Sequence, residues 1–448
     1  MARVSVALLL VLALAVRVAE VERTSYRPIN DGRSYLTLAG EVARTGDYSS
    51  LDRGAGGSLG PSAYFPPAYP YLLAAVDRIT GHSSGPITQA VHTVRISQAL
   101  LGTVTVALVW LVALELLGPT IALIALAIAA VYPVLVEMSG LIAAENLLVA
   151  LVLGAVYTVL RSRRSLHPTA WIAAAGVLTG LAALTHENAI LLLAPLVAAV
   201  WPRPRASLRS LRAAAVLVVT AALTILPWTI RNAIVLDRFI PVSDETGFTL
   251  RGTYNPTSAA FQEVPYKWRP FSEIAQDRPL AKQAPGLTET ELDSRLTQRA
   301  LSYISDHPLS PLVVAYHNTL RLLELEGSFA WRASAAAVSL PGGTAQIGVV
   351  GFWLLFVLAV IGAFTRAARA APRWVWAVPI LYGLSVVLVN TETPRFRGSI
   401  DPFLILLAAC ALGALPTLLS GRSPVGRGFE PPAPSGDREL VDVVKSLT

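Results

Sequence analysis

The chain has 448 residues, of which 54% are hydrophobic and 15% charged, and its formal net charge is +7. Soluble domains carry roughly 25% charged residues, so this composition excludes an ordinary soluble protein. Several apolar runs approach the roughly 20 residues that cross a bilayer as a helix, which indicates an all-α polytopic membrane protein. The single cysteine, Cys410, excludes an internal disulfide framework and a cysteine zinc cluster.

The first apolar run covers residues 4–19 and follows Arg3. It has the charged start of a secretory signal, but the many later apolar runs, and Arg17 near its far end, favour an uncleaved first membrane helix. Residues 21–90 then form a first outer loop. Its residues 33–46 predict an interfacial helix that ends at Gly46 and shows an apolar side to the membrane surface. The apolar segment that ends near Thr80 is too short to span comfortably, so it is predicted to be re-entrant or interfacial.

Nine further apolar runs predict spanning helices, giving about ten with the first. They lie at about residues 92–115, 119–137, 141–160, 169–185, 187–201, 212–229, 346–365, 374–390 and 401–419.

Arginine clusters between these runs predict the orientation. Basic residues favour cytoplasmic loops and do not form the continuous stripe of a nucleic-acid-binding surface. The clusters at 161–164, 203–212 and 366–373 all fall on one side if the chain has these ten helices. Both termini are then predicted to be cytoplasmic, and the protein is expected in the cytoplasmic (plasma) membrane.

The same orientation divides the chain into four parts. Residues 1–229 form an N-terminal transmembrane module and residues 230–345 an extracytoplasmic region, in which 292–304 and 309–325 have helical periodicity. Residues 346–420 form the C-terminal membrane helices. Residues 421–448 are rich in Pro and Gly at first and are predicted to be a disordered cytoplasmic tail.

Several polar residues fall at the outer ends of these helices, where an apolar chain carries few charges. Asp31 follows the first helix and is either the N-cap of the next helix or a general base for an acceptor hydroxyl. Glu145 opens a spanning helix, where it either complements the helix dipole or acts as a second acid. With Asp31, it could also hold a divalent cation. His186 and Glu187 form a tight outer turn, which is either simply solvated or binds substrate.

Outer arginines are disfavoured by the positive-inside rule and therefore need a reason. Arg231, followed by Asn232, leaves a helix after an interfacial tryptophan, and Arg395 and Arg397 lie in a short outer loop. A planar guanidinium binds phosphate oxygens well, so these three residues are candidates for binding a lipid phosphate. The alternative is pairing with Glu392 or with lipid headgroups.

The chain resembles the GT-C superfamily of polyprenyl-phosphate-sugar glycosyltransferases, in particular the group of protein mannosyltransferases and aminoarabinose transferases (glycosyltransferase family 39). The matching elements are Asp31 with Tyr35-Leu36-Thr37-Leu38-Ala39, Gly46-Asp47-Tyr48, Pro66-Pro67-Ala68-Tyr69-Pro70, Arg95 to Gly102, Tyr132-Pro133 with Glu145, Pro227 to Asn232, and Arg395-Phe396-Arg397. They extend over residues 1–420. The chain departs from many relatives at Asn30, where they carry a second acid, and at His186-Glu187, where they often have an arginine.

The resemblance implies an inverting transfer of a sugar from a polyprenyl-phosphate donor to a hydroxyl acceptor at the outer face of the membrane. Asp31 would be the catalytic base, Glu145 the second acid, and the three arginines would face the lipid phosphate. Tyr35, Tyr69, His186, Glu187, Asn232 and Glu392 would be substrate-binding residues. The acceptor could be a glycan, a lipid or a protein, and nothing in the sequence requires a cofactor beyond the possible divalent cation.

Two other classes of protein fit the composition. A transporter or lipid flippase would usually show internal repeats and polar residues at mid-membrane, whereas the polar groups identified here gather at helix ends. A non-catalytic membrane scaffold would use the same acids as caps. Release of polyprenyl phosphate would separate both from a transferase.

Overall fold

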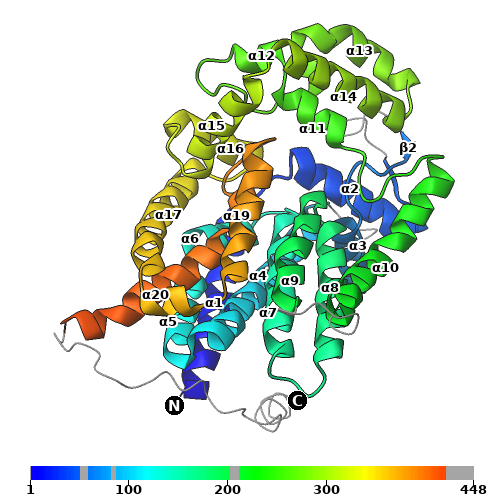
Figure 1. Ribbon diagram of the computed structural model, residues 1–448. Helices are drawn as coiled ribbons and strands as arrows, with labels where there is room; N and C mark the ends of the chain where they lie inside the picture. The colour runs from blue at the N-terminus through cyan, green and yellow to red at the C-terminus, as the bar shows by residue number, and fades with distance from the viewer. Residues whose placement is uncertain (1, 51–58, 82–86, 202–210, 420–448) are drawn as a thin grey trace.

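The computed structural model describes residues 2–50, 59–81, 87–201 and 211–419. The described residues are almost entirely helical, and their one strand pair is the antiparallel β1 (Ser49–Ser50) and β2 (Gly60–Pro61). The predicted fold class is therefore confirmed. In Figure 1 a bundle of upright helices fills the lower part of the molecule, and shorter helices form a layer above it.

The bundle contains a helix at every predicted span. Their bounds are α1 (Ala2–Arg23), α4 (Ile87–Leu117), α5 (Pro119–Val131) with α6 (Pro133–Ser139), α7 (Glu145–Ser162), α8 (Pro168–Ala183), η2 (Glu187–Leu192) with α9 (Leu193–Val200), α10 (Arg212–Val235), α17 (Gly342–Ala363), α19 (Arg373–Val387) and α20 (Asp401–Leu419). Among the described residues, five helices are long and apolar enough to cross a membrane, or six if α5 and α6 count as one bent span. The protein is a multi-pass membrane protein, and the count of ten spans stays a prediction.

The predicted helix at 119–137 is broken. Tyr132 adopts an extended conformation before Pro133, and α5 and α6 meet at an angle of 54°. The break leaves backbone carbonyls at the end of α5 without helical hydrogen bonds. The Arg17 guanidinium of α1 donates to two of them, the carbonyl oxygens of Ala129 and Ala130, at 3.1 and 3.0 Å. These carbonyls lie at the C-terminal end of α5, where a cation complements the helix dipole. In the sequence, Arg17 only favoured an uncleaved first membrane helix. In the structure its side chain is completely buried inside the bundle.

The first outer loop holds two packed helices, α2 (Asn30–Thr45) and α3 (Ala68–Thr80). Gly46 ends α2 in the left-handed conformation with φ 84°, as predicted, but α2 begins three residues before the predicted start at 33. Its apolar side, with Leu38 and Val42, is buried in one cluster with Leu73 of α3. The apolar periodicity of this helix therefore reflects packing against protein and not only contact with a membrane surface.

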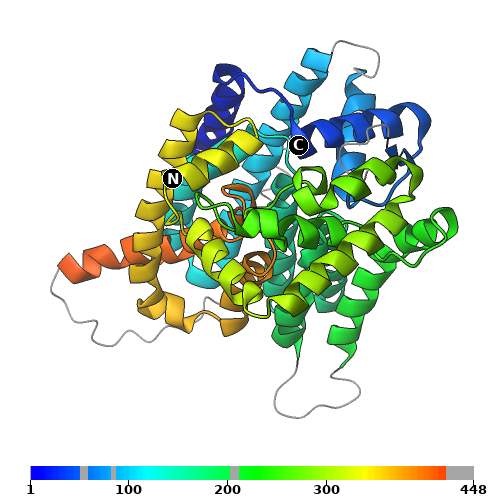
Figure 2. The ribbon, with the colours of Figure 1, turned by 90° about the horizontal axis from the view of Figure 1, so that it is seen from above.

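The outer region between α10 and α17 consists of short helices. They are α11 (Thr246–Thr253), α12 (Pro256–Ala259), α13 (Arg278–Gln283), α14 (Glu289–Asp306), α15 (Ser310–Leu322) and α16 (Ser328–Ala337), with 3₁₀ turns between them. α14 and α15 correspond to the two helices predicted at 292–304 and 309–325. Figure 2 shows this layer from above, lying across the ends of the membrane helices.

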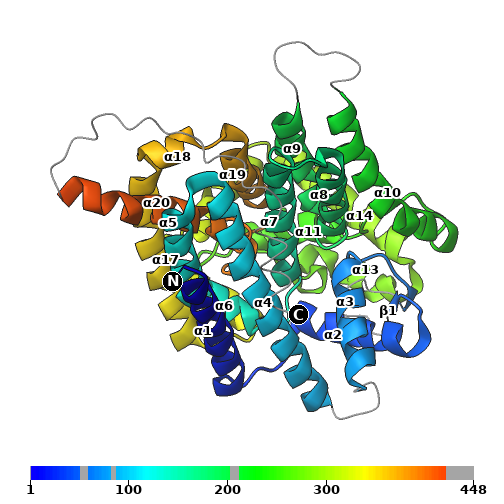
Figure 3. The same cartoon turned by 90° about the horizontal axis from the view of Figure 1, so that it is seen from below.

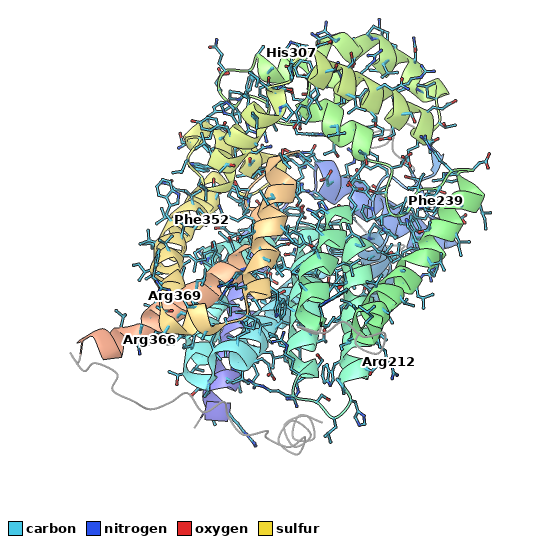
Figure 4. All side chains as sticks on the ribbon, viewed as in Figure 1. Arg212, Phe239, His307, Phe352, Arg366 and Arg369 are labelled. Carbon is cyan, nitrogen blue, oxygen red and sulfur yellow. The ribbon has the colours of Figure 1, made fainter. Side chains whose placement is uncertain are left out.

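Arginine clusters lie at the lower end of the bundle. In Figure 4, Arg212, Arg366 and Arg369 lie in the lower part of the molecule, far from His307 in the layer above. Figure 3 shows this lower face, with the start of α1 and the short α18 (Arg366–Ala370) on it. The arginine clusters that the structure describes therefore share one side, as the sequence predicted, and the cytoplasmic position of that side stays a prediction. The predicted disordered tail, 421–448, lies outside the described residues.

Candidate functional site

Asp31 and Glu145 both begin helices at the upper end of the bundle. Asp31 is in the first turn of α2, whose N-cap is Ile29, and Glu145 is the first residue of α7, whose N-cap is Ala144. Neither carboxylate serves as an N-cap side chain, so N-capping does not account for Asp31, while both acids lie in a first helical turn, where they complement the helix dipole. α7 is largely surrounded by other helices, which places Glu145 at the end of the most buried membrane helix.

A glycine lets these two helix starts approach each other. A Cβ built on Gly32 would lie 2.7 Å from the Tyr26 hydroxyl and 3.3 Å from the Ile142 carbonyl oxygen. Ile142 belongs to the segment just before Glu145, so a larger side chain at position 32 would push α2 away from that segment. The neighbouring Asn30 has φ 46° and donates from Nδ2 to the Ala337 carbonyl oxygen at 2.8 Å, which fixes the start of α2 against α16.

Arg395 joins the two acids. Its Nη2 lies 2.9 Å from Asp31 Oδ2 and its Nε lies 3.0 Å from Glu145 Oε1. Arg395 is 250 positions from Glu145 and 364 from Asp31 in the chain, yet its guanidinium bridges both carboxylates. The Glu145 side chain is 2% exposed and that of Asp31 40% exposed, so the cluster opens toward Asp31.

The cluster retains unused hydrogen-bonding capacity. Glu145 Oε2 is buried without a hydrogen-bond partner, and Nη1 of Arg395 has no acceptor within the described part of the chain. Burial alone would lower the pKa of Arg395, but Glu145 and Asp31 raise it well above its usual range, so the guanidinium stays charged. A permanent cation with a free donor, beside a partly exposed carboxylate, can bind an anion and accept a proton next to it.

Aromatic side chains line the protein beneath Asp31. The Tyr35 ring lies edge-on to Tyr69, with centroids 5.0 Å apart, and 4.6 Å from Phe65. Both tyrosines are buried, at 6% and 0% exposure. Burial raises the pKa of Tyr35 well above its usual value, and nearby Asp31 and Glu145 add to this. The predicted substrate-binding tyrosines therefore belong to the packing that supports Asp31, and a substrate would reach them only after a rearrangement.

Glu187 and His186 lie at the same end of the bundle. Ser243 Oγ donates to Glu187 Oε2 at 2.7 Å, and the His186 ring is 6.0 Å from the Phe396 ring, next to Arg395. Glu245 was missed by sequence analysis. Burial raises its pKa well above the usual value, and Glu187, Asp31 and Glu145 contribute, so Glu245 adds to a group of acids around Arg395. No motif marks Glu245, because it lies in the outer region, beyond the matching element that ends at Asn232.

Lys267 is the second missed residue. Its Nζ lies 2.8 Å from Glu392 Oε1, and both side chains are largely buried. Burial would raise the pKa of Glu392, but the charges of Lys267 and Arg395 lower it. Glu392 is therefore an ionised carboxylate between two cations, one from the outer region and one from the site. In the sequence, Lys267 stood out only as one of three lysines in the chain.

Arg231 and Asn232 lie in a different environment. Arg231 donates to the carbonyl oxygens of Ser62 and Tyr48, both at 2.7 Å, and its guanidinium lies 4.8 Å from the Trp228 ring centroid. Asn232 is fully buried and donates to the Ile240 carbonyl oxygen at 3.0 Å. These contacts hold the first outer loop and the end of α10, so the structure does not bring this pair together with Arg395.

Arg397 points away from Arg395 although only one residue separates them in the chain. It is 2% exposed, and its Nη1 lies 2.8 Å from Glu324 Oε1 while its Nε lies 3.2 Å from Asp401 Oδ1. Its guanidinium also lies 3.7 Å from the Phe352 ring centroid. These partners occupy Arg397 in packing the short 3₁₀ helix η6 (Arg395–Arg397) against the bundle. Arg397 therefore positions Arg395 in this structure.

The two acids suggested as metal ligands are already paired. No group of three or more His, Cys, Asp or Glu side chains arranged to hold a metal ion occurs among residues 2–50, 59–81, 87–201 and 211–419. Between Asp31 and Glu145, the positive charge comes from Arg395.

Comparisons with known proteins agree with this architecture. Residues 65–230 match the family model of dolichyl-phosphate-mannose-protein mannosyltransferases. An oligosaccharyltransferase of Archaeoglobus fulgidus in its apo form has a similar structure, with a TM-score of 0.56 at 16% identity, over 95% of this chain and 53% of that one. The oligosaccharyltransferase AglB of the same organism, in complex with an inhibitory peptide and a dolichol-phosphate, gives a TM-score of 0.54 at 14% identity, over 100% and 54% of the two chains. The chain therefore shares its overall fold with this oligosaccharyltransferase.

ArnT of Cupriavidus metallidurans bound to undecaprenyl phosphate is also similar, with a TM-score of 0.42 at 15% identity, over 91% of this chain and 77% of ArnT. Among curated proteins, none matches the sequence significantly. The chain spans about half the length of the oligosaccharyltransferase, and the family model covers α3 to most of α10. The matched segment contains Tyr69, Glu145 and His186, while Asp31 and Arg395 lie outside it.

Proposed function

We propose that this protein is an inverting glycosyltransferase that moves a sugar from a polyprenyl-phosphate donor to a hydroxyl acceptor at the outer face of the cytoplasmic membrane. The observation that supports this most is the bridge from Arg395 to both Asp31 and Glu145. The family match adds support, since that model is named for a dolichyl-phosphate-linked mannose. The similar oligosaccharyltransferase was solved with a dolichol-phosphate, which is the same kind of lipid carrier.

The proposed step breaks one bond and forms another. The acceptor oxygen forms a bond to the anomeric carbon of the sugar, while the bond between that carbon and the phosphate oxygen breaks. The acceptor proton passes to Asp31, through the carboxylate oxygen that Arg395 does not hold. The electron pair of the broken bond stays on the lipid phosphate, which gains negative charge and leaves as polyprenyl phosphate.

Arg395 would stabilise that developing charge with its free Nη1 donor. A preorganised cation in a partly buried site needs no reorganisation during the reaction, which is where electrostatic catalysis gains most. Glu145 holds Arg395 in place from the buried side and has a free oxygen for a sugar or acceptor hydroxyl. Lys267, paired with Glu392, brings a second cation from the outer region toward the phosphate.

The orientation belongs to the same proposal. The arginine clusters at 161–164 and 366–373 favour the cytoplasm for the lower face of Figure 1, so the site lies on the opposite, extracytoplasmic side. Both termini would then be cytoplasmic. The lipid tail would remain in the outer leaflet, while the outer region selects the acceptor, which is a glycan, a lipid or a protein.

Measuring polyprenyl phosphate release in proteoliposomes would test the proposal. A panel of polyprenyl-phosphate sugars is supplied, and the Asp31→Asn variant is compared with Asp47→Asn, which changes an exposed acid of the same loop. Release is expected from the unaltered protein and from Asp47→Asn, and not from Asp31→Asn. Release by Asp31→Asn at the unaltered rate would remove Asp31 as the base. Transport of the donor without release would identify a flippase instead.

A further inference from the structure

Helix α15 in the outer region has inverted polarity. Its outward side chains are apolar, with Leu312 68% exposed and Tyr316 62% exposed. Its inward side chains are largely polar, since Asn318 is 0% exposed and Arg321 is 3% exposed. A helix at the surface of a water-soluble region shows the opposite arrangement, with apolar residues inward and polar residues outward.

The inward polar groups have protein partners. Asn318 Nδ2 donates to the Val387 carbonyl oxygen at 3.0 Å, and Arg321 Nη1 donates to Asn318 Oδ1 at 2.8 Å. Arg321 also forms an ion pair with Glu326 and donates to the Pro265 carbonyl oxygen. Because these bonds attach α15 to α19 and to the outer region, the orientation of the helix is fixed. The apolar side must therefore be matched by what surrounds the protein.

Contacts with two membrane helices indicate the depth of α15. Asn318 bonds to the last residue of α19, and Trp353 of α17 donates from Nε1 to the Leu323 carbonyl oxygen at 3.1 Å. Leu384 of α19 and Leu388, which follows its last residue, are apolar and 52% and 49% exposed. The C-terminal half of α15 is thus level with the outer end of an apolar membrane helix.

Exposed apolar side chains also occur on α16 and α17. Ile347 and Leu354 of α17 are 61% and 66% exposed, and Phe329 of α16 is 53% exposed. Figure 1 shows α15 and α16 next to the upper end of α17. Single exposed apolar side chains are common on proteins, but several on neighbouring helices, one of them long and apolar enough to cross a membrane, indicate a shared apolar environment.

We propose that α15 is a membrane-interface helix whose Leu309, Leu312, Val313 and Tyr316 contact the acyl chains of the outer leaflet. Amphipathic helices bury their apolar side to about 5–10 Å at this boundary, and tyrosine is enriched there. The inference concerns the bilayer and does not depend on the sugar transfer proposed above. It places part of the predicted extracytoplasmic region, residues 230–345, in the membrane.

The contact also reaches the candidate site. The end of α15 provides the Leu322 carbonyl oxygen, 3.3 Å from Arg397 Nη1, and the next turn provides Glu324, 2.8 Å from the same nitrogen. Arg397 belongs to the segment that holds Arg395. The lipid-facing helix therefore supports the loop that carries the site arginine, and its seating in the bilayer stabilises that loop.

Fluorescence quenching in proteoliposomes would test this. A bimane label is placed on Leu312→Cys of the full-length protein, with Leu354→Cys of α17 as the lipid-facing control and Gln298→Cys on α14 as the water-exposed control. The native thiol, Cys410, is 1% exposed and does not compete for the label. Leu309→Cys provides a second position on the same face, should the label at 312 disturb folding.

The label at 312 is expected to be quenched by phospholipid brominated near the headgroup, as at 354, and to be protected from aqueous iodide. Quenching by iodide as strong as at 298, without quenching by brominated lipid, would overturn the proposal. Protection from both quenchers would also overturn it, because a second copy or a partner protein would then cover the helix.

Discussion

Replacing Arg395 by alanine should destabilise the protein as well as stop transfer. The change leaves the Glu145 carboxylate 2% exposed with no cation against it, and its second oxygen already lacks a partner. Breaking a buried ion pair by removing one member costs about 3–5 kcal/mol. The bond to Asp31 contributes less, about 0–1 kcal/mol, because that carboxylate is 40% exposed. The melting temperature should fall on the order of 5 °C.

Glu145→Gln in the same chain provides the matched control. The double variant Arg395→Ala/Glu145→Gln removes the buried charge together with its partner, so it should recover most of the lost stability while staying inactive. Unfolding is followed in detergent by the reaction of a thiol-specific dye with Cys410, which is buried at 1% exposure and reacts only when the bundle opens. A double variant as unstable as Arg395→Ala would refute the reasoning, since the loss would then not come from the stranded Glu145 charge.

Three further outcomes follow from the site and its surroundings. Lys267→Ala should raise the KM for the donor about tenfold, since a hydrogen bond to a charged group contributes about 1.5–3 kcal/mol. Lys267→Arg should restore the original KM. An unchanged KM in Lys267→Ala would exclude Lys267 from donor binding. Arg397→Ala should lower the melting temperature more than it raises the donor KM, because Arg397 is bound by Glu324 and Asp401; a selective KM effect would mean that it faces the phosphate. Burial raises the pKa of the Glu289 carboxyl to about 7. Just below pH 7 the folded state therefore keeps a proton that the unfolded chain has released. The stabilisation that this carboxyl allows at low pH is lost as the pH rises through 7. Glu289 accepts hydrogen bonds from Ser62 Oγ and the Ala63 amide. The protection factors of the amides at residues 59–65, which correct for the intrinsic pH dependence of exchange, should therefore fall between about pH 5 and pH 8, and Glu289→Gln should remove that fall. An equal fall in the variant would contradict it.

The sequence predicted the helices because hydrophobic length and period are local properties. Every apolar run became a helix, and Gly46 ended α2 because a left-handed C-cap favours glycine. It did not predict the break at Tyr132, although Pro133 marked it, because proline is tolerated at the start of a helix as well as at a kink. The buried Arg17 that satisfies the broken end depends on α1 packing beside α5, which no local pattern reveals.

The site was predictable in part. Asp31, Glu145 and Arg395 were each marked by a charge at a helix end in an apolar chain, and the structure brings these three together. The same rule also selected Arg231, which binds backbone carbonyls, and Arg397, which binds buried acids. The rule fails for these two because the direction of a side chain depends on tertiary packing. Glu245 and Lys267 escaped notice because polar residues are common in the outer region, and only the fold brings these two to the site.

The configuration at the anomeric carbon tests the central claim most directly. A polyprenyl-phosphate sugar of defined configuration is supplied to the reconstituted protein with its acceptor, and the product is examined by NMR. A single displacement with Asp31 as base predicts the opposite configuration in the product. A product that keeps the donor configuration would contradict the account. Retention would require two displacements through a covalent sugar intermediate, whereas Asp31, Glu145 and Arg395 are proposed to carry out a single displacement.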